Sequence, residues 1–378
     1  MKQIKISAKE LEEIKKLEKN RFDFVYVSID KITDNLNIVF EEINRILKPG
    51  GFLEVWNNGL DDSSFEKSLI PFLEGNYDWM AHIKGSIRSD NIYNFGLGLF
   101  KLDLDSINFI NYTQMVQDII KWSDQLPRDF DCVVGLPRSG LLVATIIAQL
   151  KNIPVASIDK DNKLILLQKG RRVASDVIKK LLVVDDSMSV GNTLRDAKHM
   201  LKEYNCEYGA LYYTSISEQL LDYGFKEVNQ LRVFEWNLWQ HPILNWSFMD
   251  IDGVLCEDPT DEQNDDGINY LKFLEEVKPK YLPTIYINTL ITCRLKKYKK
   301  QTEDWLRKYN IQYQNLIMMD YPTKEARQAD AKYAEFKAEV YKDSNAKLFI
   351  ESELWQAKKI ANLTNKQVLC TKNMEMYR

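Results

Sequence analysis

Residues 179–201 read KKLLVVDDSMSVGNTLRDAKHML, and this stretch decides the fold of the middle of the chain. Its apolar run predicts a buried strand that ends in two carboxylates, Asp185 and Asp186, and a short polar loop with Gly191 leads into an amphipathic helix. Loop amides and the positive end of a helix dipole favour phosphate, and glycine lets the backbone approach an anion closely. The stretch therefore predicts a phosphate-binding loop at the carboxyl end of a strand.

Polar side chains complete this loop. Ser187, Ser189 and Thr193 can add hydroxyl donors, and Asn192 precedes Thr193. The acid pair can accept hydrogen bonds from the vicinal hydroxyls of a ribose, because ligands of open α/β sheets bind at the carboxyl ends of the strands. A sugar phosphate thus fits one loop. The alternative is a strand that ends in solvated acids.

The stretch resembles the signature of the type I phosphoribosyltransferases. The resemblance implies that Asp185 and Asp186 hold the 2- and 3-hydroxyls of phosphoribosyl diphosphate and that the following loop holds its 5-phosphate. Val190 stands where many members have threonine, which removes one hydroxyl contact but leaves the backbone amides in place.

A second loop lies upstream, in FDCVVGLPRSGLLVATIIAQL at residues 130–150. It resembles the diphosphate-binding loop of the same family, in which Arg138 would neutralise a diphosphate oxygen while the amides of Ser139 and Gly140 donate to it. Taken alone, it is only a turn before a helix. Residues 159–173, with the basic cluster KGRR at 169–172, lie where the family carries a mobile flap, and a basic surface loop is the alternative.

Apolar strands alternate with amphipathic helices from residue 112 onwards, which indicates a parallel sheet covered on both faces. We expect helices at 112–126, 141–150 and 193–204, and strands at 130–135, 155–158, 180–184 and 210–214. A second such series starts at Trp246. The aromatic run VFEWNLWQHP at 233–242 favours core or interdomain packing, with a stacking platform for a sugar or base as the alternative.

The second series opens with FMDIDGVLCEDP at residues 248–259. Asp250 and Asp252 lie two residues apart, on one face at the end of a strand, and Gly253 opens the turn. One carboxylate can attack phosphorus, and the other can protonate the leaving alcohol and then activate water, while both help to hold a magnesium ion. The alternative is a pair of exposed acids at a strand end.

The motifs that follow resemble those of the haloacid-dehalogenase-type phosphatases. The resemblance implies a phosphate-binding hydroxyl at Thr292, in NTLITCRLKKYKKQTEDWL at 288–306. It implies a phosphate-binding lysine at Lys337, in EFKAEVYK at 335–342, with Lys342 as the alternative.

The fourth motif of this resemblance is LFIESELWQA at residues 348–357. Family members more often have aspartates where this chain has Glu351 and Glu353, so which glutamate binds metal stays open. The implied Mg2+ ligands are hard oxygen donors, namely Asp250, Asp252, Glu351 and Glu353. Neither the gap from Asp252 to Thr292 nor the gap from Thr292 to Lys337 leaves room for a large cap domain. This predicts an open site that admits bulky substrates.

The N-terminal segment has a different pattern. We expect a helix at 8–19, a strand at 22–29, a helix at 36–47, a break at Pro49-Gly50-Gly51 and a strand at 52–56. Residues 22–56 resemble the second half of an S-adenosylmethionine-dependent methyltransferase, but the glycine-rich cofactor turn of that family is absent. We interpret the segment as a non-catalytic remnant or a platform for the acceptor. Residues 59–111, rich in aromatic residues, have no assignable pattern.

Composition limits the partners. The chain has 378 residues and a formal net charge of −4, which gives no overall attraction to nucleic acid or to an anionic membrane. Five separated cysteines without a CxxC pair favour a reduced, cytoplasmic chain. No export signal and no apolar run long enough for a membrane span are found in the sequence. A homo-oligomer is possible.

The sequence thus predicts a multidomain α/β chain. It has a small segment at 1–110, a type I phosphoribosyltransferase domain at 111–242 and a Rossmann-like phosphatase domain of the haloacid-dehalogenase type at 243–378. A phosphatase fused to a phosphoribosyltransferase would destroy a salvaged nucleotide, which favours an acceptor on which unphosphorylated ribofuranose is the wanted product. The pairing resembles the ribofuranosyltransfer modules of bacterial surface polysaccharide synthesis, with a glycan acceptor. The alternatives are a nucleobase phosphoribosyltransferase fused to a nucleotidase, and a protein that only senses phosphoribosyl diphosphate.

Overall fold

The computed structural model describes residues 3–7, 11–19, 21–29, 36–57, 85–89, 92–100, 106–159, 163–167, 178–229 and 231–378. The chain forms two compact units, which are Met1–Asn108 with Tyr112–Arg232, and Phe109–Asn111 with Val233–Arg378. The chain passes between the units in β6 (Asn108–Ile110) and β13 (Arg232–Phe234), which form a two-stranded sheet. The sequence-based division at residues 110 and 242 stays a prediction.

The central sheet of the first unit has the strand order β12-β11-β10-β7-β8-β9. All neighbouring pairs are parallel except the last, β8 with β9. Its elements are α4 (Tyr112–Gln125), β7 (Cys132–Gly135), α5 (Gly140–Lys151), β8 (Val155–Ile158), β9 (Leu164–Leu166), β10 (Leu181–Met188), α6 (Asn192–Met200), β11 (Cys206–Tyr213), η1 (Glu218–Leu220) and β12 (Tyr223–Glu227). The expected parallel arrangement of strands and helices is confirmed for this part of the chain.

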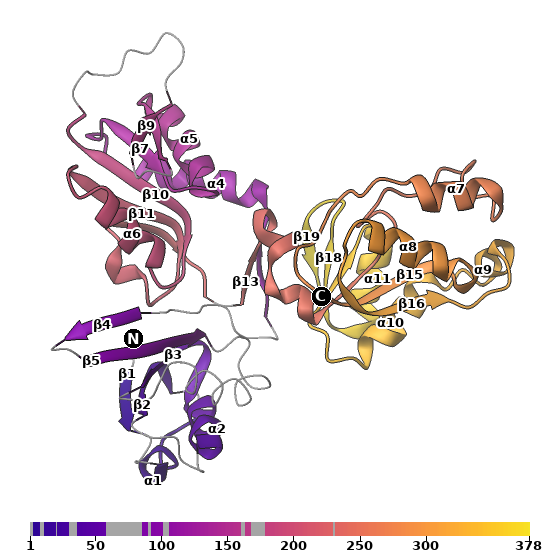
Figure 1. The fold of residues 1–378 in the computed structure, drawn as a ribbon, viewed down its shortest axis with the longest axis horizontal. Coiled ribbons are helices and arrows are strands. Elements are labelled where there is room, and N and C mark those ends of the chain that lie inside the picture. The colour runs from indigo at the N-terminus through magenta and orange to yellow at the C-terminus, as the bar shows by residue number, and fades with distance from the viewer. Residues whose placement is uncertain are drawn as a thin grey trace. The chain divides into compact units, whose positions relative to one another are not determined.

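Helices cover both faces of this sheet (Figure 1). On one face, α6 packs its Leu194 and Ala197 against Val134 and Val183 in a single apolar core. On the other face, α5 lies so close to β7 that a Cβ on Gly135 would come within 2.6 Å of the Leu141 backbone. Glycine is therefore required at the end of β7, because any side chain would push α5 away from the sheet.

The strand with the acid pair is longer than expected. The sequence predicts a strand at 180–184 followed by a loop, whereas β10 continues to Met188. The reason is pairing, since Ser187 and Met188 lie in register with Tyr212 and Tyr213 of β11. The two carboxylates therefore belong to the end of a strand and not to a free loop.

The second unit contains a six-stranded sheet with the order β16-β15-β14-β17-β18-β19, in which only β18 and β19 pair antiparallel. Its apolar core joins α10 and α11 to one face of the sheet, through residues such as Tyr341, Ile360 and Phe349. Its elements are η2 (Glu235–Gln240), η3 (Pro242–Trp246), β14 (Ser247–Met249), α7 (Ile268–Glu276), β15 (Ile287–Leu295), η4 (Lys296–Tyr298), α8 (Lys299–Lys308), β16 (Tyr313–Met319), α9 (Lys324–Asp330), α10 (Tyr333–Lys342), β17 (Leu348–Glu351), α11 (Leu354–Thr364), β18 (Gln367–Cys370) and β19 (Glu375–Tyr377).

The N-terminal part of the first unit has its own sheet, with the order β1-β2-β3-β5-β4. Its elements are β1 (Gln3–Ser7), α1 (Leu11–Ile14), β2 (Phe22–Ile29), α2 (Leu36–Ile46), β3 (Leu47–Asn57), β4 (Gly85–Ser89) and β5 (Ile92–Phe100). The expected strand at 22–29 is confirmed by β2, and α2 matches the expected helix to within one residue. The likeness to methyltransferases stays a prediction.

Two expectations for this segment are wrong. The helix expected at 8–19 is limited, among the described residues, to α1, and β1 precedes it. The expected break at Pro49-Gly50-Gly51 lies inside β3, which runs through it. A shift in the register between Phe22 and Phe24 of β2 explains this, because a bulge takes up the residues that cannot continue the regular ladder.

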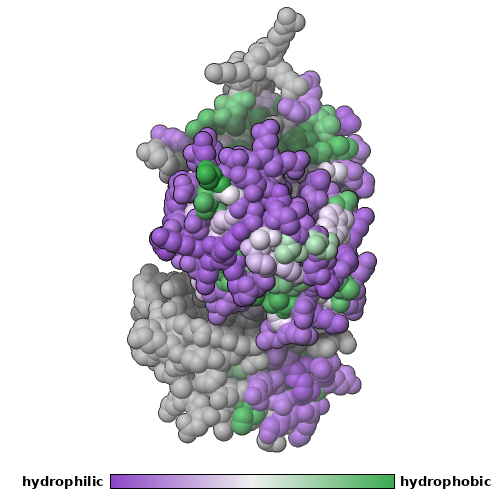
Figure 2. Space-filling model, turned by 90° about the vertical axis from the view of Figure 1, so that its right-hand side faces the viewer, coloured by the Kyte–Doolittle hydropathy of each residue, from purple (hydrophilic) through white to green (hydrophobic). Residues whose placement is uncertain are grey.

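No helix in the described part of the chain combines the length and the apolar character that a membrane crossing needs. In Figure 2, the described residues on the face toward the viewer are mostly hydrophilic.

Candidate functional site

The two predicted loops of the first unit meet at the carboxyl edge of its sheet. A Cβ on Gly140, the first residue of α5, would lie 2.9 Å from Asp185 Oδ1 and from the Val184 carbonyl oxygen. The amide of Leu136 donates to the same Val184 carbonyl at 3.0 Å. The start of α5 therefore packs directly on the acid pair, and this contact requires glycine at position 140.

The acid pair itself is poorly solvated. Asp186 is buried and Asp185 half-buried, and Asp185 Oδ1 accepts a hydrogen bond from the Asp186 amide at 2.9 Å. Burial and the neighbouring Asp186 charge raise the pKa of Asp185 well above its ordinary value, while the cation of Arg232 opposes this rise. Perturbed carboxylates of this kind cluster at functional sites.

The loop after β10 turns sharply at Gly191. This residue has φ +82°, and a Cβ there would lie 2.5 Å from Leu220 Cδ1, so glycine is required for both reasons. Asn192 and Thr193 follow as exposed residues in the first turn of α6, where their amides point toward the helix N-terminus. Ser187, in β10, is half-buried. These positions suit the predicted phosphate contacts, whose roles stay predictions.

The predicted diphosphate-binding turn, residues 136–140, exposes the arginine that is expected to contact diphosphate. Arg138 is exposed, Ser139 is half-buried at the N-terminus of α5, and the Pro137–Arg138 peptide bond is cis. The predicted flap residues 169–172 lie outside the described residues.

Side chains outside both predicted motifs hold the predicted phosphate-binding loop at residues 187–193, called the phosphate loop below. Ser217 Oγ donates to the Met188 carbonyl at 3.1 Å, and Thr214 Oγ1 donates to the Ser189 carbonyl at 2.5 Å. Arg232 Nη2 donates to Ser189 Oγ. Thr214, Ser217 and Arg232 are all buried and distant in sequence from the loop, so no local motif could indicate them.

In the second unit, Lys337 joins two of the predicted acids. Asp250 follows β14, and Glu351 ends the neighbouring strand β17. Lys337 Nζ, on α10, lies 2.5 Å from Asp250 Oδ2 and 2.6 Å from Glu351 Oε2. All three side chains are buried. The structure thus brings together the predicted nucleophile, the predicted phosphate-binding lysine and one of the two candidate glutamates.

This cluster changes the proton affinity of its members. Burial raises the pKa of Asp250 to about 7, although the Lys337 cation works against the rise. Burial lowers the pKa of Lys337, but the charges of Asp250 and Glu351 outweigh this effect and hold it well above its ordinary value. Lys337 is therefore a permanent cation at neutral pH.

The second acid of the motif is bound by an arginine that the prediction did not include. Arg294 Nη2 lies 2.6 Å from Asp252 Oδ1, and Arg294 Nε lies 3.0 Å from Asp252 Oδ2. The guanidinium is fully buried and also donates to Thr302 Oγ1 at 3.4 Å. Arg294 follows Thr292 by two residues in β15, so the alternation of side chains along a strand could have indicated it.

The remaining predicted residues differ in placement. Thr292 is fully buried, and its Oγ1 accepts a hydrogen bond from the Arg294 amide at 3.2 Å. Glu353 directly precedes α11 and pairs with Lys372 at 3.6 Å, with 40% of its side chain exposed. Of the two candidate glutamates, Glu351 therefore faces the acid–lysine cluster and Glu353 points to a surface lysine.

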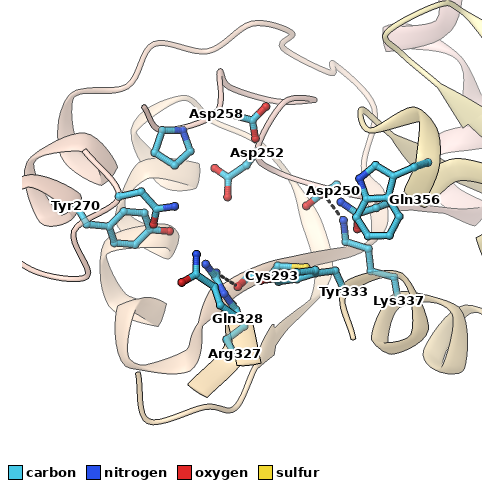
Figure 3. A pocket seen from close by; sticks show the side chains of 13 residues that line it. Asp250, Asp252, Asp258, Tyr270, Cys293, Arg327, Gln328, Tyr333, Lys337 and Gln356 are labelled. Carbon is cyan, nitrogen blue, oxygen red and sulfur yellow. Dashed lines mark hydrogen bonds and ion pairs between the residues drawn. The ribbon is translucent and has the colours of Figure 1, made fainter. Parts of the chain in front are cut away.

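Asp250 and Asp252 open into a cavity of about 310 Å³ (Figure 3). Burial of its carboxyl and the charges of Asp252, Glu353 and Glu351 raise the pKa of Asp258, a further acid in the cavity wall, to about 6. The lining combines acids, amides and aromatic rings, and it comprises Asp250, Asp252, Asp258, Pro259, Asn264, Tyr270, Cys293, Arg327, Gln328, Tyr333, Lys337, Trp355 and Gln356.

The residues of this cavity fit a magnesium ion held by few protein ligands. Mg2+ is usually bound through one or two carboxylates, with water and substrate phosphate completing the shell. Asp250 lines the cavity, and Glu351 lies beside it, since both carboxylates contact the same Lys337 nitrogen, so these two are the candidate ligands. No group of three or more acid, histidine or cysteine side chains in the described part of the chain is arranged to hold a metal alone. The cavity lining carries three carboxylates, Asp250, Asp252 and Asp258, and two cations, Arg327 and Lys337. A dianionic phosphate bound there would therefore need further positive charge.

Comparison with known families finds a match, and it covers the first of these two sites. Residues 109–244 match the family model of the phosphoribosyl transferase domain. This stretch contains both predicted loops and Arg232, and it is less than half of the chain. The central part of the chain thus matches a phosphoribosyl transferase domain.

Solved structures similar to this chain include three phosphoribosyltransferases. A purine phosphoribosyltransferase from Pyrococcus horikoshii is 21% identical, with a TM-score of 0.27, and the match covers 34% of this chain and 93% of that one. A xanthine-guanine-hypoxanthine phosphoribosyltransferase from Helicobacter pylori is 15% identical, with a TM-score of 0.28, and the match covers 35% of this chain and 93% of that one. An orotate phosphoribosyltransferase from Aeropyrum pernix is 18% identical, with a TM-score of 0.25, and the match covers 31% of this chain and 71% of that one. No curated protein matches the chain.

Proposed function

We propose that the chain catalyses two reactions in sequence. The first unit transfers 5-phosphoribosyl from phosphoribosyl diphosphate to an acceptor, and the second unit removes the 5-phosphate from the product. The acceptor is a sugar hydroxyl, as in the synthesis of a surface polysaccharide that contains ribofuranose.

One observation supports the pairing most directly. A chain with a phosphoribosyl transferase domain also carries, in its second unit, a buried strand-end aspartate bound to a buried lysine and a second acid. This arrangement, with Asp252 two residues after Asp250, suits a phosphatase of the haloacid-dehalogenase type. The first reaction leaves a phosphate monoester on ribose, and the second site is suited to that group.

In the first reaction, the bond between C1 of the ribose and the diphosphate oxygen breaks as the acceptor hydroxyl forms its bond to C1. Asp185 and Asp186 hold the two ribose hydroxyls, and the loop from Ser187 to Thr193 holds the 5-phosphate. Arg138, with the amides of Ser139 and Gly140, stabilises the charge that develops on the departing diphosphate. Bound Mg2+ would neutralise further diphosphate charge. The acceptor hydroxyl loses its proton as its bond to C1 forms, and diphosphate is the leaving group.

In the second reaction, Asp250 attacks phosphorus while Asp252 gives a proton to the departing 5-oxygen. The aspartyl phosphate on Asp250 then breaks as water attacks phosphorus and Asp252 takes the water proton, which restores the Asp250 carboxylate and the protonated Asp252 and releases phosphate. Lys337 holds Asp250 in place and offsets the phosphate charge, and Thr292 is the predicted hydroxyl contact. When bound at Asp250 and Glu351, Mg2+ would supply Lewis-acid stabilisation of the phosphoryl oxygens.

The test is incubation of the purified chain with labelled phosphoribosyl diphosphate and panels of oligosaccharides and nucleobases, followed by mass analysis. A ribosylated oligosaccharide, and its phosphorylated form with the Asp250→Asn chain, is the expected result. Formation of a ribosylated or phosphoribosylated nucleobase would contradict the glycan acceptor and show that the acceptor is a nucleobase. Binding without turnover of phosphoribosyl diphosphate in every panel would favour a sensor and contradict the proposal.

A further inference from the structure

Arg232 is a buried arginine at the start of β13, and only 4% of its surface is exposed. Burial lowers its pKa to about 10, and the charges of Asp186 and Asp185 oppose this effect. A buried guanidinium costs free energy unless other groups compensate its charge. Arg232 therefore lies in the electrostatic environment of the acid pair, although it is far from that pair in sequence.

The contact of Arg232 is with a side chain of the phosphate loop. Its Nη2 donates a hydrogen bond to Ser189 Oγ. An arginine has no acceptor, so the hydroxyl hydrogen of Ser189 must point to a different partner. A hydroxyl that accepts a bond from a cation also becomes a better donor, because successive hydrogen bonds polarise one another. The contact thus prepares Ser189 to donate.

The backbone of the loop is held by other residues. Thr214 Oγ1 donates to the Ser189 carbonyl at 2.5 Å and Ser217 Oγ donates to the Met188 carbonyl at 3.1 Å. The Thr214 amide also donates to the Met188 carbonyl at 3.2 Å. Because these buried bonds position the loop, the bond from Arg232 is not needed for the path of the backbone. For the loop, its consequence is the direction of the Ser189 hydroxyl.

We propose that Arg232 is a positioning residue that directs the Ser189 hydroxyl at an oxygen of the 5-phosphate of phosphoribosyl diphosphate. The inference rests on the proposed function, since that function places the 5-phosphate at this loop. It adds a residue outside both predicted loops to the recognition of the phosphate monoester. Arg232 acts through Ser189 and need not touch the ligand.

A double-mutant cycle tests this role. The affinity for phosphoribosyl diphosphate is measured by calorimetry for the full chain carrying Asp250→Asn, so that the second unit does not cleave the ligand. Ser189→Ala and Arg232→Met should each weaken binding by about 10-fold to 100-fold, the range for a lost hydrogen bond to a charged group. The double variant should be no weaker than the worse single variant, because both changes remove the same contact to phosphate. Arg232→Lys, which keeps a cationic donor, should restore part of the affinity.

Arg128→Met is the matched control, because Arg128 is an exposed arginine of the same unit between α4 and β7. It should leave the affinity unchanged. A chain with only Asp250→Asn that binds no phosphoribosyl diphosphate would contradict the proposed function. Binding that is present but insensitive to Ser189→Ala, or losses that add in the double variant, would overturn the role of Arg232 alone. Thermal unfolding identifies a variant that fails to fold, and Ser189→Ala and Arg232→Lys then decide the outcome.

Discussion

Both oxygens of the Asp252 carboxylate accept hydrogen bonds from the guanidinium of Arg294, at 2.6 Å from Nη2 and 3.0 Å from Nε. A bidentate pair fixes a carboxylate in orientation as well as in position. Asp252 is the residue expected to transfer protons in the second unit. Arg294 therefore determines where that carboxylate points.

Replacement of Arg294 by methionine should damage both stability and phosphatase activity. It leaves Asp252 partly buried without its cation, and loss of one partner of a buried ion pair costs about 3–5 kcal/mol. Thermal unfolding and hydrolysis of p-nitrophenyl phosphate measure the two effects. Arg307→Met is the control, because Arg307 forms an exposed pair with Asp304, and it should change neither. An Arg294→Met chain with full activity would show that Asp252 needs no such support.

The raised pKa of Asp250 predicts how stability depends on pH. The carboxyl has an ordinary pKa of 3.8 and a folded value of about 7, so between these values the folded state binds more protons than the unfolded state. Stability contributed by this group should therefore decline as the pH rises from about 4 to about 7. The measurement is the melting temperature across this range without added Mg2+, for the natural chain and for Asp250→Asn. The advantage of Asp250→Asn should grow with pH, and a constant difference would contradict the shift.

Mutation should distinguish the two candidate glutamates by its effect on phosphatase activity. Glu351 is buried and bound to Lys337, whereas Glu353 is half-exposed and bound to Lys372. Glu351→Gln should reduce phosphatase activity about 10-fold to 100-fold and weaken its dependence on Mg2+, as losses of metal-supporting residues do. Glu353→Gln should change either property less than about twofold. The experiment is a magnesium titration of phosphate release, and a larger effect at Glu353 would reverse the assignment.

The phosphate loop should not tolerate a side chain at Gly191. Alanine at φ +82° is strained, and its Cβ would lie 2.5 Å from Leu220 Cδ1. Gly191→Ala should cost about 1–3 kcal/mol of stability and weaken binding of phosphoribosyl diphosphate. Lys202→Ala is the control, because Lys202 is an exposed residue of the same unit and its replacement by alanine should change neither property. Denaturant unfolding and calorimetry test both variants, and equal stability of the two would contradict the prediction.

Much of the candidate site could be predicted because its residues lie in short stretches of sequence. A strand that ends in Asp185 and Asp186, followed by a glycine turn and a helix, is local, and so is the spacing of Asp250 and Asp252. The exact course of the strands was less predictable. β3 includes Pro49 only by way of a register shift between its pairs at Leu47 and Phe52. β10 continues past the acid pair because Ser187 and Met188 pair with β11.

The sequence by itself determined which strand ends carry the chemistry, because each motif is short. Asp185, Asp186, Gly191 and the start of α6 lie close together in sequence, and so do Asp250, Asp252 and Gly253. Only the tertiary structure decided which cations serve those acids. Arg232 reaches Ser189 across 43 residues, Arg294 reaches Asp252 across 42, and Glu351 rather than Glu353 meets Lys337. Such contacts depend on the order of the strands and on which side chains are buried together. A buried charge then takes the partner that the packing brings within hydrogen-bond distance, whatever their separation along the chain.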